Sequence, residues 1–107
     1  MPSSTYALFR QAILNRQPVT CRYKGKRREI CPHVLGTKRR REKILAWQFA
    51  GGSSKPGGLP PGGEWRCMFV DEITLATITP GEWRTGDGHK WDQSCVDKVD
   101  IDVAKLR

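Results

Sequence analysis

The stretch PVTCRYKGKRREICPHV, residues 18–34, alternates between apolar and polar side chains on both sides of Gly25. A period of two is typical of half-buried β-strands, and a two-residue turn between two such strands makes a hairpin. We place this turn at Gly25 and Lys26, so that Lys24 pairs with Arg27. The segment therefore predicts an antiparallel β structure.

The same register sets Arg22 opposite Glu29 and indicates which side chains share a face. That shared face is predicted to hold Val19, Cys21, Tyr23, Arg28 and Ile30. Pro32 cannot donate a backbone hydrogen bond, which indicates a strand end or a bulge at that position.

The rest of the chain supplies one helix and several further strands. Apolar residues recur every three or four positions near the N-terminus, which predicts a helix over about 4–16, capped by Ser3 or Ser4 and ended by Pro18. Further strands are predicted over residues 43–50, 64–70 and 75–79, with one more edge strand within 95–103. The segment GGSSKPGGLPPGG, residues 51–63, is predicted to be a long mobile hairpin loop.

At 107 residues the chain is expected to form one domain. We predict a mainly β (α+β) fold, in which the N-terminal helix precedes a small, strongly bent antiparallel barrel of five or six strands. The barrel is expected over about 18–80, followed by a turn-rich tail over 81–107.

Positive charge is concentrated in the first part of the chain. Residues 1–43 hold twelve Lys and Arg against Glu29 and Glu42, a local charge of +10, whereas residues 44–107 sum to −2. Such asymmetry predicts that one side of the molecule attracts an anionic small molecule, a nucleic acid or an acidic protein.

The cysteine spacing and the N-terminal residues indicate in which cellular compartment we expect the protein. The four cysteines contain no C-x-x-C pair, so we expect no zinc site and reduced, packed thiols at Cys21, Cys31, Cys67 and Cys95. The N-terminus does not resemble a secretory signal, and no apolar stretch approaches the ~20 residues that span a bilayer. We therefore expect a cytoplasmic protein without a membrane segment.

The sequence contains no catalytic motif. It lacks H-E-x-x-H, a nucleophile elbow and a cysteine linked by a motif to a histidine base. We expect a protein that is not an enzyme and that uses no cofactor or metal.

Several motifs, taken in order, resemble the WYL domain, a family of small Sm-like barrels found mostly in bacterial regulators. These motifs are a strand ending in Tyr23, R-x-x-x-P-H at residues 28–33, the strand KILAW, and WR-x-x-x-V-D-x-I at residues 65–73. The name-giving tripeptide is degenerate, because only Leu45 is retained at residues 43–45. The resemblance implies a ligand-sensing or nucleic-acid-contacting module in transcriptional regulation.

Two groups of residues are candidates for binding an anion. The first group is eight cations near two adjacent strand connections, whose spacing suits a phosphate backbone and whose alternative interpretation is solvated turns: Lys24, Lys26, Arg27, Arg28, Lys38, Arg39, Arg40 and Arg41. The second group combines planar rings with nearby donors: Tyr23, His33, Trp65 and Arg66. For Arg66 the alternative is an ion pair with Asp71 or Glu72, and for the aromatic residues it is core packing.

These observations favour a non-enzymatic regulatory module that binds an anionic ligand, a nucleotide or single-stranded nucleic acid. The alternative is an interaction module that self-associates as a homodimer or binds a partner regulator, in which case the basic face serves solubility.

Overall fold

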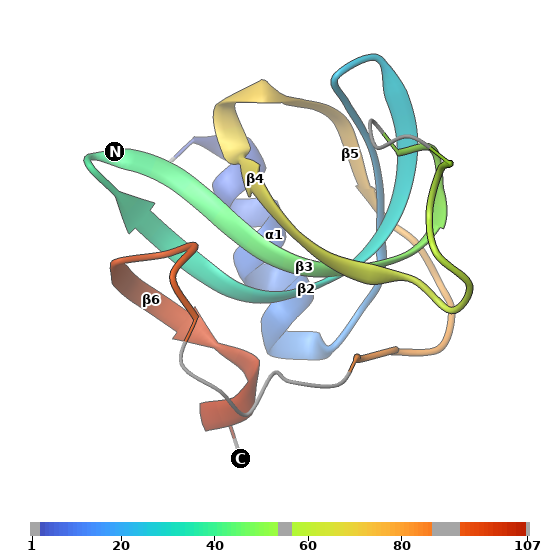
Figure 1. Ribbon diagram of the computed structural model, residues 1–107. Helices are drawn as coiled ribbons and strands as arrows, with labels where there is room; N and C mark the ends of the chain where they lie inside the picture. The colour runs from blue at the N-terminus through green and yellow to red at the C-terminus, as the bar shows by residue number, and fades with distance from the viewer. Residues whose placement is uncertain (1–2, 54–56, 87–92, 107) are drawn as a thin grey trace.

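The computed structural model describes residues 3–53, 57–86 and 93–106. One helix packs on a curved sheet of six antiparallel strands (Figure 1). The elements are α1 (Ser4–Asn15), β1 (Val19–Tyr23), β2 (Lys26–Lys38), β3 (Arg41–Gly51), β4 (Glu64–Phe69), η1 (Val70–Glu72), β5 (Ile73–Ile78), β6 (Lys98–Asp102) and η2 (Val103–Lys105).

Helix α1 begins and ends close to the predicted positions. The Ser3 hydroxyl accepts a hydrogen bond from the Tyr6 amide, which caps the first turn. Arg16 takes a left-handed conformation (φ 49°) at the other end, and its amide donates to the Ala12 and Ile13 carbonyls. The predicted helix is confirmed, and its buried face carries Tyr6, Phe9, Ala12 and Ile13.

The β1–β2 hairpin is confirmed, but the predicted register is wrong by two residues. Tyr23 pairs with Lys26, so the turn consists of Lys24 and Gly25, with Arg22 opposite Arg27 and Thr20 opposite Glu29. Both turn residues have positive φ, 51° and 76°, as a type I′ turn requires, and glycine adopts that conformation without strain. A shift of two residues preserves the faces, so the predicted shared face of β1 and β2 is confirmed and is buried.

Strand β2 pairs with three strands along its 13 residues: β1 at its start, β3 over most of its length and β6 near its end. The register with β3 shifts between Pro32 and Val34, so of the two alternatives predicted at Pro32, a strand end or a bulge, the structure has the bulge. The predicted edge strand in the tail is confirmed as β6. The predicted hairpin loop links the paired strands β3 and β4, and its residues 54–56 lie outside the described residues.

The predicted class is confirmed, but the sheet does not close into a barrel. Its strand order is β4-β3-β2-β1-β5, and over the described residues β4 and β5 do not pair. The three-residue turn η1 carries the chain from β4 to β5, which then pairs with β1. Helix α1 lies behind the curved sheet and covers the face that a closed barrel would enclose (Figure 1).

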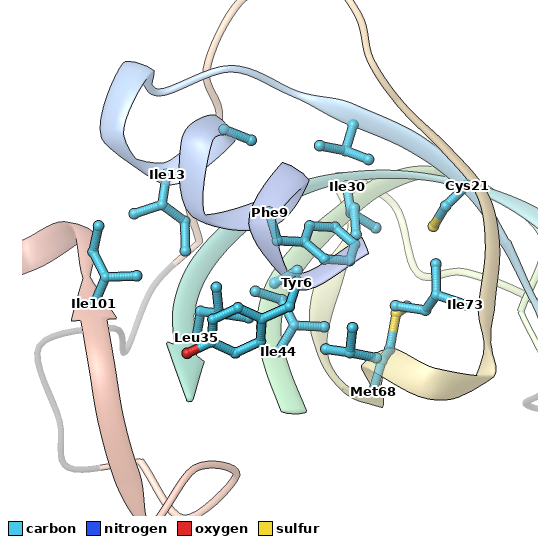
Figure 2. Packing of buried hydrophobic residues seen from close by; sticks show 14 of the residues in the cluster. Tyr6, Phe9, Ile13, Cys21, Ile30, Leu35, Ile44, Met68, Ile73 and Ile101 are labelled. Carbon is cyan, nitrogen blue, oxygen red and sulfur yellow. The ribbon is translucent and has the colours of Figure 1, made fainter. Parts of the chain in front are cut away.

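The main core lies between α1 and this inner face of the sheet. Figure 2 shows Phe9 projecting from α1 among side chains of the strands, including Ile30, Leu35 and Ile44. Phe9 is completely buried. Burying an aromatic side chain of this size stabilises the fold by about 2 kcal/mol, which fixes the helix on the sheet.

Two of the four cysteines form a disulfide, Cys67–Cys95, which joins β4 to the segment before β6. The expectation of reduced thiols is therefore wrong for this pair and confirmed for Cys21 and Cys31, which are free and buried. Sequence spacing could not reveal the pair, because the fold brings together two positions that are 28 residues apart.

We expect Gly36→Ala to weaken the pairing of β6 with β2. A Cβ at Gly36 would overlap the Lys98 carbonyl oxygen and lie 2.6 Å from Val96 Cγ1, so the backbone of β6 would have to move. The free energy of unfolding in urea should fall by about 1–3 kcal/mol. Amide hydrogen exchange should accelerate in β6, whereas Lys98→Ala, at an exposed position, should change neither quantity. Unchanged protection of β6 in Gly36→Ala would contradict this account.

Candidate functional site

The face of the sheet that points away from α1 carries alternate residues of β3 and β4. Ile44 and Met68 point into the main core, so their neighbours along each strand point the other way. We call this the outer face. Three cross-strand pairs lie on it: Lys43 with Phe69, Leu45 with Cys67, and Trp47 with Trp65.

A hollow of about 360 Å³ opens at one end of the outer face. Its lining consists of Lys38, Arg39, Arg41, Lys43 and Phe69, and we call it the cationic cradle. The Arg41 guanidinium lies 3.7 Å and the Lys43 ammonium 4.4 Å from the centre of the Phe69 ring. Cation–π attraction of this kind holds both charges against one apolar surface.

Carboxylates fix Arg41 in the cradle. Its Nη2 donates to Asp71 Oδ1 at 2.7 Å and to Glu72 Oε2 at 3.1 Å, and these bonds raise the pKa of Arg41. From the sequence, an ion pair with Asp71 or Glu72 was the alternative to phosphate binding for Arg66, but these two acids pair with Arg41 and Arg66 pairs with Glu64. Asp71 and Glu72 lie in η1, directly after β4, and that turn brings them to the tip of the β2–β3 hairpin.

The surroundings of Lys43 disfavour its charged form. Partial burial lowers its pKa, and the like charges of Lys38 and Arg41 lower it further, against a smaller opposing effect of Asp97. A bound anion would relieve this repulsion, because it favours the charged form of the ammonium group.

The tip of the β2–β3 hairpin is conformationally strained. Lys38 pairs with Arg41, and the two turn residues, Arg39 and Arg40, have φ values of 52° and 68°. Asn and Gly are the residues that adopt such angles readily, whereas a left-handed residue with a long side chain costs roughly 1–2 kcal/mol. Two arginines thus occupy positions where the backbone favours smaller residues.

Trp65 and Arg66 lie on opposite faces of the sheet. Trp65 is on the outer face, with its ring against those of His33 and Trp47. Arg66 points to the inner face, where its Nη1 donates to Glu64 Oε1 at 2.8 Å. Both side chains of that ion pair are less than one sixth exposed. Strand alternation therefore separates two neighbours that the sequence suggested as one binding unit.

Arg28 and Tyr23 lie inside the protein and not on the binding surface that we predicted for them. Arg28 is completely buried, and its Nε and Nη2 donate to the Tyr23 carbonyl at 3.3 and 3.1 Å. Its Nη1 donates to Gln48 Oε1 at 3.4 Å. Burial, and then the charge of Arg66, lower the pKa of Arg28. These interactions give Arg28 a structural role at the β1–β2 turn.

His33 is also buried, at the bulge in β2. Its Nδ1 lies 2.6 Å from the Cys31 carbonyl, which can only accept, so Nδ1 carries a proton. Its Nε2 lies 2.9 Å from the Thr85 hydroxyl. The Cys31 thiol instead accepts from the Arg84 amide at 3.3 Å, so His33 does not activate it.

The structure thus gathers the four predicted cations of residues 38–41 at one hairpin tip, and it adds residues that sequence analysis did not select. Lys43 and Phe69 complete the cradle because cross-strand pairing places them side by side. In the sequence, only the alternation of the strand indicated that Lys43 belongs to this site, since Lys43 follows Arg41 by two positions and therefore shares its face.

Two features are absent from the described residues. They contain no cluster of His, Cys, Asp and Glu able to hold a metal ion. Among these same residues, α1 is too short and too polar to cross a membrane.

Comparisons with known proteins identify no relative: neither models of protein families, nor curated proteins, nor solved structures gave a match. The resemblance to the WYL domain stays a prediction from sequence motifs.

We expect Arg28→Leu to destabilise the fold strongly. The change removes the buried hydrogen bonds that Arg28 donates to the Tyr23 carbonyl and to Gln48 Oε1, and the loss of buried bonds from a charged donor costs about 1–3 kcal/mol. Urea denaturation should show a loss in that range. Arg27→Ala is the matched control, because its side chain is 60% exposed, and it should change stability by less than about 0.5 kcal/mol. Equal effects of the two changes would refute the structural role of Arg28.

Proposed function

We propose that the chain binds a phosphate-bearing ligand in the cationic cradle, and that this ligand is single-stranded nucleic acid. The cradle itself is the observation that carries the proposal, because four cations line one hollow around an aromatic ring. Their positive charge exceeds the negative charge of the three carboxylates that act on Arg41 and Lys43, which are Asp71, Glu72 and Asp97. Arginine and lysine side chains arranged in this way neutralise phosphates and release condensed counterions.

The strain at the hairpin tip supports this interpretation. Arg39 and Arg40 hold left-handed conformations that an Asn-Gly turn would adopt at lower cost. Strained residues cluster at functional sites, where a binding interaction offsets their cost. Of these two residues, Arg39 lines the cradle, and the exposed Arg40 adds a further positive charge beside it.

A continuous strand suits this surface better than a compact anion. The cations are distributed along β2, the turn and β3, and aromatic side chains follow on the same face. Binding to single strands commonly combines a positively charged groove with rings that stack bases. Regulation of transcription is the role that we propose for such binding, in keeping with the resemblance to the WYL domain.

One observation favours the alternative of self-association. Leu75 lies on β5, an edge strand that pairs only with β1 over the described residues, and it is 75% exposed. It also has a positive φ of 54°. An exposed leucine on an open edge suits contact with a second copy.

Sedimentation at increasing protein concentration tests for self-association, and Leu75→Ser should abolish any dimer that forms.

We expect Arg39→Asn/Arg40→Gly to stabilise the protein and weaken its binding. Asn-Gly suits the type I′ turn, so the free energy of unfolding should rise by about 1 kcal/mol. The slope of log affinity for a labelled oligothymidylate against log salt should flatten by ~0.7 for each phosphate that the variant no longer neutralises.

The matched control removes two charges from the other hairpin, as Lys24→Asn/Lys26→Ser. Lys24 occupies the equivalent turn position, so this variant also tests the effect of an Asn-Gly turn on stability. Its salt slope should equal that of the parent protein. Equal slopes in all three proteins would refute binding at the cradle.

We also expect affinity for the oligothymidylate to fall as pH rises, beginning below the range in which an ordinary lysine titrates. The pKa of Lys43 is lowered, so its charge is lost first, and an anion binds the charged form. The loss should be about 1 kcal/mol, roughly fivefold in affinity. Lys43→Arg should remove this early decline, because a guanidinium stays charged. A decline that persists unchanged in Lys43→Arg would contradict the assignment to Lys43.

A further inference from the structure

A second hollow adjoins the cationic cradle on the outer face. It has a volume of about 380 Å³ and shares Lys38 and Lys43 with the cradle. Beyond those two cations its lining changes character: Leu45, Trp65, Cys67, Gln93, Ser94 and Cys95. A ring and an aliphatic side chain are thus placed next to two ammonium groups.

Trp65 is positioned to serve as a stacking surface. It lies on the same strand and the same face as Phe69, four residues away, which corresponds to roughly 13 Å along β4. Edge contacts with the rings of His33 and Trp47, at 4.8 and 5.2 Å between centres, hold it in one orientation. A rigid ring that lines a hollow beside cations suits a nucleobase whose phosphate is held by those cations.

Residues 93–95 form one wall of the second hollow, and three kinds of bond hold this wall. The disulfide joins Cys95 to Cys67 of β4. Lys38 Nζ donates to the Ser94 carbonyl at 2.7 Å. The Gln93 amide exchanges two bonds of 2.8 Å with the Val96 backbone. The disulfide is the only covalent bond among these.

We propose that this second hollow is a base-binding subsite for single-stranded nucleic acid, and that the Cys67–Cys95 disulfide assembles it. The inference rests on the proposed function, since the neighbouring phosphates occupy the cradle. A base stacks on Trp65, and Lys38 and Lys43 hold the phosphate between the two hollows. Binding at both hollows requires more than one nucleotide, so the subsite makes affinity depend on strand length.

Oxidation state would then control binding to longer strands. Cys67 is exposed while Cys95 is buried, so an incoming thiolate reaches the sulfur of Cys67. A dithiol attacks this sulfur, displaces the Cys95 thiolate, and then closes to its own cyclic disulfide as Cys67 leaves. Two electrons and two protons pass to the protein, which ends with two thiols. The wall at residues 93–95 then loses its covalent link and is held by its hydrogen bonds and by the packing of Cys95 and Val96 against Val34.

Fluorescence anisotropy tests the proposal on the full chain with two labelled thymidylate probes, a short one of a single nucleotide and a long one of about eight nucleotides. In the oxidised protein the long probe should bind about tenfold more tightly than the short one. After reduction with a dithiol, and in Cys67→Ser/Cys95→Ser, this ratio should fall to about twofold, with the affinity for the short probe unchanged. The dithiol should have no effect on the double variant, which controls for effects at Cys21 and Cys31.

Trp65→Leu provides a second test that leaves the disulfide in place. It should lower the ratio as reduction does, and far-ultraviolet circular dichroism should confirm that it is folded. A ratio that stays at about tenfold after reduction or in folded Trp65→Leu would overturn the subsite while leaving the cradle intact. If neither the short nor the long probe binds, the proposed function is overturned as well.

Discussion

The long strand β2 is the constraint on which the rest of the structure depends. Its 13 residues pair with β1, β3 and β6, so most of the sheet is hydrogen-bonded through one continuous backbone segment. The bulge between Pro32 and Val34 lets one strand serve these different neighbours, because an extra residue changes the register and increases the local twist. Gly36 allows β6 to approach closely enough to pair.

This curved sheet separates the main core from the surface for which we propose binding. The inner face holds the main core against α1, and it also buries Arg28 and the ion pair of Arg66 with Glu64. The outer face holds the cradle and the hollow beside Trp65. Residues adjacent in sequence therefore differ in role according to which face they occupy, as Trp65 and Arg66 illustrate.

Aromatic side chains and covalent links order the outer face. Phe69 holds two cations that repel each other against one ring, and Asp71 and Glu72 fix one of them. The disulfide brings the tail back against β4. This arrangement concentrates positive charge on one surface and holds Arg41 in place, which would reduce the ordering entropy lost in the anion binding that we propose.

The sequence by itself determined the helix, the strand positions, the β1–β2 face and the basic hairpin tip, because these follow from local periodicity, capping and charge order. It did not determine the turn at Lys24 and Gly25, where neighbouring registers preserve the same faces. Only the tertiary structure decided that the sheet stays open, that Arg28 is buried, and that Cys67 meets Cys95. Each of these depends on contacts between segments far apart in the chain, and local patterns carry no information about which distant segments meet.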